Sequence, residues 1–62
     1  LPNEQKLVRT KRFDKKPLDV DEAISQMELL GHNFFAFVNA ETDEINIVYK
    51  RKDENYGLLQ PE

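Results

Sequence analysis

His32 is the one side chain in this sequence that titrates near neutral pH, so it is the first candidate for acid–base chemistry. A histidine that activates a nucleophile needs a serine or cysteine beside it and a third group that orients it. The chain has no cysteine, and Ser25 lies seven residues upstream on a predicted helix. His32 follows the end of that helix, where the dipole favours an imidazolium. We therefore predict a structural histidine and no catalytic residue, and keep a small enzyme using His32 as a third hypothesis.

The carboxylates also form no convincing metal site. Asp19, Asp21 and Glu22 cluster where a helix is predicted to begin, which is typical of capping. A calcium or magnesium site needs converging oxygens from a dedicated loop, and the acidic segment 41–44 is too short for one. Without cysteine and with a single histidine, a structural zinc site is excluded as well. We predict no metal and no cofactor.

Basic side chains gather in the first third of the chain. Residues 1–18 hold six basic and two acidic side chains, a net charge of +4, whereas residues 19–44 hold seven acidic side chains and no lysine or arginine. Basic side chains can contact RNA phosphate, but on a strand they often serve only to prevent aggregation at a sheet edge. The candidate ribosome- or RNA-contacting residues are Arg9, Lys11, Arg12, Lys50, Arg51 and Lys52.

The elements that would position these residues follow from periodicity and punctuation. Residues 6–13 alternate in part and indicate a charged edge strand, which Pro17 ends. Asp19 and Glu22 form a capping box, apolar residues then recur at helical spacing, and Gly31 supplies a left-handed stop; we predict a helix over about 19–30. Strands are predicted at 33–39, 45–51 and 56–59. The predicted fold is a small α+β domain, in the order β-α-β-β-β, with one helix on a mostly antiparallel four-stranded sheet.

The loop lengths predict which side chains share a sheet face. A four-residue loop at 40–43 pairs Phe34 with Tyr49, and a two-residue turn at 53–54 pairs Tyr49 with Leu58. One face then carries Phe35, Phe37, Val48 and Leu59. The opposite face is larger, and we predict it as a dimer interface made of Phe34, Ala36, Val38, Ile45, Ile47, Tyr49 and Leu58.

One helix with a narrow apolar stripe suits the smaller face and leaves the larger face bare. A second copy packed face to face would bury it around a twofold axis. The alternative, in which the helix covers the larger face, leaves the Phe35 face for the partner. In either arrangement the sheet exposes more apolar surface than one helix can hide, which predicts a homodimer through the sheet.

Composition and length agree with a single small domain. A chain of 62 residues buries only about 60% of its unfolded surface, and small scaffolds often compensate by oligomerising. No apolar run approaches the roughly 18 residues of a membrane span, and no signal peptide is visible. We expect no membrane partner, a cytoplasmic location and a fragment of a longer protein. The expected parts are a linker remnant at 1–5, a dimerisation domain at 6–60 and a tail at 61–62.

Two runs resemble a known family over about residues 7–61, nearly the whole chain. They are "VRTKRFDKKPLDVDEAISQMELLGHNFFAFVNAET" and "INIVYKRKDENYGLLQP", and the strings "QMELLGH", "FF", "VYKRKD" and "YGL" occur in the family's order and spacing. The family is the C-terminal domain of long ribosome hibernation promoting factors. One departure is Glu54, where family members often carry glycine in the turn.

The resemblance implies a function that the residues alone do not. In long-form factors an N-terminal domain binds the small ribosomal subunit, and the C-terminal domain dimerises and tethers two ribosomes into an inactive pair under stress or in stationary phase. The expected function is therefore homodimerisation in ribosome hibernation, with itself and the small subunit as partners. The alternative is an RNA- or ribosome-surface-binding domain that uses the basic residues given above.

Overall fold

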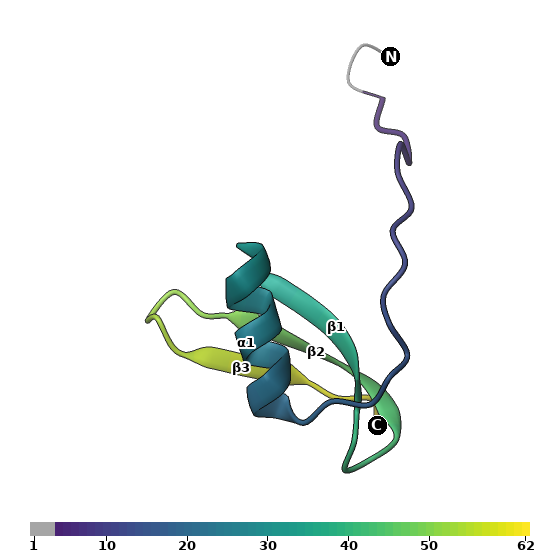
Figure 1. The fold of residues 1–62 in the computed structure, drawn as a ribbon. Coiled ribbons are helices and arrows are strands. Elements are labelled where there is room, and N and C mark those ends of the chain that lie inside the picture. Colours follow the sequence, from purple (N-terminus) through teal and green to yellow (C-terminus); the bar gives the residue numbers. More distant parts are fainter. Residues whose placement is uncertain (1–3) are drawn as a thin grey trace.

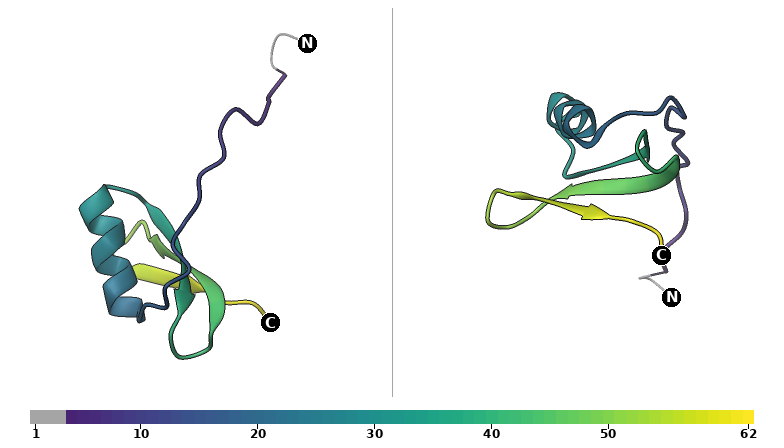
Figure 2. Two further views of the ribbon diagram at one scale, coloured as in Figure 1. Left: turned by 45° about the vertical axis from the view of Figure 1, so that its right-hand side comes forward. Right: turned by 90° about the horizontal axis from the view of Figure 1, so that it is seen from below.

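The computed structural model describes residues 4–62 and shows an α+β domain with one helix and one antiparallel sheet (Figure 1). Helix α1 (Val20–Leu30) comes first and is followed by strands β1 (Phe34–Asn39), β2 (Glu44–Lys50) and β3 (Tyr56–Leu59). The strands lie in the order β1-β2-β3, and α1 lies over one face of the sheet (Figure 2). The α+β class is confirmed, but the sheet of the described residues has three strands and not four.

Asp19 and Gly31 set the two ends of α1, as predicted. The Asp19 carboxylate accepts a hydrogen bond from the backbone N–H of Glu22 at 2.8 Å, which satisfies one free donor at the helix start. Gly31 has a φ of 70°, a left-handed conformation that glycine adopts without a steric penalty. Its N–H donates to the Glu28 carbonyl at 3.1 Å, and the helix ends there.

The β1–β2 hairpin has the predicted register. Residues 40–43 connect the strands, and the Asp43 N–H donates to the Asn39 carbonyl at 2.7 Å while Asp43 itself is left-handed with a φ of 59°. The predicted partners are all present: Phe34 with Tyr49, Ala36 with Ile47, Val38 with Ile45, and Asn39 with Glu44. The confirmed register determines which β1 and β2 side chains share a face.

The predicted β2–β3 register is wrong by one residue. Tyr49 pairs with Gly57 and Val48 with Leu58, so Leu58 and Leu59 exchange faces relative to the prediction. The reason is the turn. Glu54 takes a left-handed φ of 72°, and the Arg51 N–H donates to the Asn55 carbonyl at 2.7 Å. This encloses a three-residue loop with a left-handed third residue, a common hairpin type, instead of the two-residue turn that was assumed.

The strand predicted at residues 6–13 is absent, and that prediction is wrong. Residues 4–17 form an extended arm without helix or strand, and much of it runs away from α1 and the sheet (Figures 1 and 2). Pairing begins only at Leu18, whose N–H donates to Val38 and whose carbonyl accepts from Ala40, each at 2.8 Å, beside the end of β1. The next N–H that could extend this ladder upstream is that of Lys16, and it donates instead to the Asp14 carboxylate at 2.9 Å. Of the linker predicted at 1–5, residues 1–3 lie outside the described part of the chain.

The core lies between α1 and one face of the sheet. Its fully buried apolar residues are Ala23 and Met27 of α1, Phe37 of β1 and Val48 of β2. Partly buried residues packed against this cluster are Leu18, Val20, Ile24, Phe35 and Leu58. The helix therefore covers the smaller apolar face, as the first of the two predicted arrangements has it. Across residues 4–62 no helix has the length and apolarity that crossing a bilayer requires.

Two buried asparagines form a polar pair on the same face of the sheet. Asn39 Nδ2 donates to Asn46 Oδ1 at 2.8 Å, and the Asn39 Oδ1 accepts from the Glu41 N–H at 2.9 Å. Within the described residues, Asn46 Nδ2 has no hydrogen-bond partner. A buried donor without a partner costs about 1–3 kcal/mol. The pair therefore contributes less to stability than to fixing which residues of the hairpin meet.

Replacing Phe37 tests the location of the core. Phe37→Ala should lower the free energy of unfolding by about 3–5 kcal/mol, because it opens a cavity between α1 and the sheet. The measurement is urea denaturation followed by circular dichroism. The matched control, Leu29→Ala on the exposed side of α1, should change stability by no more than about 0.5 kcal/mol. Equal effects of the two substitutions would contradict the described packing.

Candidate functional site

The sheet face that points away from α1 is the candidate functional surface. We call it the open face. Side chains that oppose each other across antiparallel strands lie on the same face, and the observed register brings six of the seven predicted interface residues together. Leu58 is the exception, because it packs against the core on the α1 side. The open face consists of Phe34, Ala36, Val38, Ile45, Ile47, Tyr49, Gly57 and Leu59.

Large apolar side chains of the open face remain in contact with solvent. Phe34 is 64% exposed, Ile45 54% and Leu59 55%, while Val38 and Ile47 are partly buried between them. None of the eight positions carries a charge. A contiguous uncharged patch of this kind on a small domain marks a site of protein association.

Tyr49 and Gly57 make the closest cross-strand contact of the open face. The Tyr49 ring lies directly over Gly57, in the place that a Cβ atom at position 57 would occupy. Glycine here leaves room for the aromatic ring, and any side chain at position 57 would displace that ring. The ring in turn covers a weak position of the edge strand β3.

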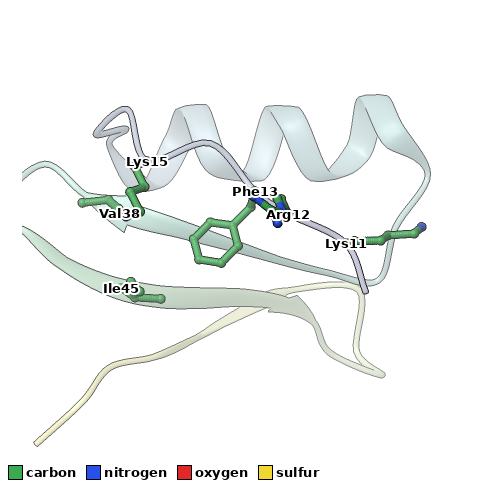
Figure 3. Close-up of a pocket in the computed structure, with 6 residues that line it drawn as sticks. All are labelled: Lys11, Arg12, Phe13, Lys15, Val38 and Ile45. Carbon is green, nitrogen blue, oxygen red and sulfur yellow. The ribbon is translucent and has the colours of Figure 1, made fainter. Parts of the chain in front are cut away.

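Phe13 of the arm borders the open face. Its ring points from the arm toward the strands that carry Val38 and Ile45 and leaves a hollow of about 340 Å³ between them (Figure 3). Phe13 is itself 43% exposed, so it covers this edge only in part. This contact was not predicted, because Phe13 was assigned to a strand. The only signal for it in the sequence was an isolated aromatic residue in a charged segment.

The predicted basic residues form two separate groups. Arg9, Lys11 and Arg12 lie on the exposed arm, whereas residues 50–52 lie at the β2–β3 turn, at the other side of the domain (Figure 1). The structure therefore does not bring the six residues together into one patch.

Acidic side chains neutralise most of the second group. Lys50 Nζ lies 3.5 Å from Glu28 Oε1 and 3.9 Å from Glu54 Oε2. Arg51 Nε lies 3.3 Å from a carboxylate oxygen of Asp53. Lys50 and Arg51 are therefore paired with carboxylates of the domain itself.

Tyr56 joins the same charged cluster on the α1 side of the sheet. Its hydroxyl donates to Glu28 Oε1 at 2.9 Å, and this hydrogen bond is the main reason why the pKa of Tyr56 lies above its usual value. The raised pKa means that the folded state favours the neutral phenol. The phenol is therefore neutral and able to donate this hydrogen bond at neutral pH, and strongly alkaline solution removes the donor.

His32 lies away from any arrangement typical of catalysis. Its backbone N–H donates to the Met27 carbonyl at 3.1 Å and completes the helix end. It borders a groove of about 830 Å³ between α1, the outer edge of β1 and the arm. The described residues that line this groove include no serine, threonine or cysteine. No group of three potential metal ligands is gathered anywhere in residues 4–62.

Gly57→Ala tests the Tyr49 contact. The new methyl group displaces the Tyr49 ring, and we expect a loss of about 1–3 kcal/mol of unfolding free energy with a changed near-ultraviolet tyrosine signal. The control is the same change in a Tyr49→Ala background, where the methyl group has space and the penalty should vanish. An equal penalty in both backgrounds would mean that the ring does not occupy this position.

Comparison with known proteins identifies the family. Residues 2–58 match the sequence model described as "Sigma 54 modulation/S30EA ribosomal protein C terminus". The chain is 60% identical over 55 residues to the ribosome hibernation promotion factor of Bacillus subtilis (strain 168), a match that covers 89% of the chain and 29% of the relative. It is 55% identical over 58 residues to the protein of the same name from Staphylococcus aureus (strain COL), which covers 94% and 30%.

The chain thus spans about 30% of the length of these relatives. The family match covers α1, β1 and β2 in full and reaches into β3, so it includes nearly all of the open face. The resemblance predicted from the sequence is confirmed: this chain belongs to the Sigma 54 modulation/S30EA ribosomal protein C-terminal family.

Proposed function

We propose that this chain is a homodimerisation module, and that its open face packs against the open face of a second copy. The observation that carries the proposal is the exposure of Phe34, Ile45 and Leu59 on an uncharged apolar surface that the described chain covers only at one edge, through Phe13. The proposed interface is Phe34, Ala36, Val38, Ile45, Ile47, Tyr49 and Leu59, with Leu59 in place of Leu58.

A second copy is the occupant that best fits this surface. An uncharged apolar face is complementary to itself, whereas a partner with opposite charge would gain nothing from it. The buried core contains only four apolar residues, and a domain of this size gains much of its stability from a partner. The hollow between Phe13 and Ile45 can accept an apolar side chain of the second copy. The contact would resemble a core divided between two chains.

In a longer protein this module would join two ribosome-bound copies. The relatives are named ribosome hibernation promotion factors and are more than three times as long as this chain. A separate domain would hold the small ribosomal subunit, and this domain would tether two ribosomes in the cytoplasm into an inactive pair. The role is non-catalytic, because a tether acts through binding alone.

The mass of the chain in solution tests the dimer. Sedimentation equilibrium should give about twice the 7.3 kDa of one chain down to low concentration. Phe34→Ala should shift this equilibrium toward monomer by about 2 kcal/mol or more, since large aromatic side chains dominate interfaces. The helical circular dichroism signal should persist, because Phe34 lies outside the core.

Two further variants make the result decisive. Ile45→Lys places a charge on the central strand of the open face and should also produce monomers. Leu29→Ala removes an apolar side chain of α1 that is more exposed than Phe34 or Ile45, and it should leave the mass unchanged. A folded Phe34→Ala chain that remains a dimer would refute the assignment of the interface. In the longer protein, Phe34→Ala should abolish ribosome pairs on a sucrose gradient and preserve binding to single ribosomes.

A further inference from the structure

The arm carries a concentration of positive charge. Residues 4–17 contain Lys6, Arg9, Lys11, Arg12, Lys15 and Lys16 against Glu4 and Asp14, and all of these side chains are exposed. The segment has no helix or strand. Its net charge is +4, whereas residues 19–62 hold ten acidic and three basic side chains and carry −7.

These cations have no acidic partner among the described residues. The ion pairs within residues 4–62 all involve Lys50 or Arg51. The nearest acid in sequence, Asp14, instead accepts a hydrogen bond from the Lys16 backbone N–H at 2.9 Å. The first part of the arm runs away from the acidic domain (Figures 1 and 2), whereas Lys11, Arg12 and Lys15 lie beside the strands that carry Val38 and Ile45 (Figure 3). Within residues 4–62 none of the arm cations forms an ion pair with a carboxylate of the domain, so their charge stays available.

We infer that residues 6–16 bind the phosphate backbone of RNA. An extended chain advances about 3.3 Å per residue, so the six cations are spread along roughly 33 Å and suit a linear polyanion. Two of the six are arginines, whose guanidinium groups pair with phosphate oxygens through two hydrogen bonds. Contacts of this kind position a protein on nucleic acid without reading the bases. The extended arm lacks the amphipathic helix that a membrane surface would select.

The structure also separates the arm from the second basic group. Lys50 and Arg51 already lie within ion-pair distance of Glu28, Glu54 and Asp53, so a phosphate would have to compete with these carboxylates. Only Lys52 of that group lacks an ion pair in the described residues. The inferred RNA contact therefore differs from the six residues predicted from the sequence. It leaves out residues 50–52 and adds Lys6, Lys15 and Lys16. It stands independently of the proposed dimer.

The test is the salt dependence of RNA binding. The probe is a fluorescein-labelled single-stranded oligouridylate of about 12 nucleotides, titrated with the chain from about 50 to about 200 mM salt. Each neutralised phosphate of a single strand contributes about −0.7 to the slope of log K against log salt. Six contacts give a slope of about −4 and a loss of affinity of roughly 300-fold over this range.

Two variants with the same change in charge provide the comparison. Arg9→Gln, Lys11→Gln and Arg12→Gln together should reduce the slope by about 2 and the loss to roughly 20-fold. Lys50→Gln, Arg51→Gln and Lys52→Gln together should change the slope by no more than about 0.7. Both variants should keep the sedimentation mass of the unmodified chain.

Several results would overturn the inference. These are no binding at the lowest salt, or equal slopes for the arm variant and the unmodified chain. A third is an arm variant whose mass falls while its RNA slope stays the same, which would assign the arm to a protein contact. A monomeric chain whose RNA binding depends on the arm would instead refute the proposed dimer and leave this inference intact.

Discussion

The buried cluster of Ala23, Met27, Phe37 and Val48 holds α1 against one face of the sheet and leaves the other face without cover from the described chain. This arrangement follows because the described chain has one helix and a sheet that carries apolar side chains on both faces. Strand β1 carries large apolar side chains on both sides, β2 adds Val48 on one side and Ile45, Ile47 and Tyr49 on the other, and an eleven-residue helix can cover only one side. Everything proposed for the open face depends on this choice. If α1 packed on the Phe34 side, the exposed surface would consist of Phe35, Phe37 and Val48.

The buried asparagine pair helps to explain which face of the sheet α1 covers. Asn39 and Asn46 lie on the core face, where each amide needs a partner and where one donor remains unsatisfied. The mutual hydrogen bond forms only when the hairpin has the observed register, because a shift by one residue would move one amide to the other face. A polar pair that reduces stability can in this way exclude alternative pairings. The open face has no such group and remains wholly apolar apart from the Tyr49 hydroxyl.

Local signals allowed the helix, the first hairpin and most of the open face to be predicted from the sequence. The Asp19 cap, the Gly31 stop and the four-residue loop are short-range features whose geometry depends on few neighbours. The predicted β2–β3 register was wrong because the sequence allowed two turns of different length. The turn at 52–54 could enclose two or three residues, and only the left-handed Glu54 decides between them. The glycine that the family resemblance implies at this position was the available clue to a left-handed residue there, and it would have placed Leu59 on the open face.

The error in the first strand has a different origin. Residues 6–13 have the alternation of a strand, but alternation does not supply a neighbouring strand with free hydrogen-bonding groups. Leu18 pairs with the end of β1, and the Lys16 N–H that would continue this pairing donates to Asp14 instead. Leu7 and Val8 are almost completely exposed, so packing of these side chains does not hold residues 6–13 in a strand either. The asparagine pair was not predicted from the sequence either, because isolated asparagines in strands are usually interpreted as solvent-facing.

The two hydrogen bonds of Leu18 also decide how force enters the domain. A pull on the arm reaches the folded part first at Leu18, where bonds to Val38 and Ala40 fasten the chain beside β1. The next point of resistance is the Asp19 cap of α1. Any load carried by the arm therefore acts first on the end of β1 and on the start of α1. The two hydrogen bonds of Leu18 would have to break before such a load could begin to unwind α1 from its N-terminus.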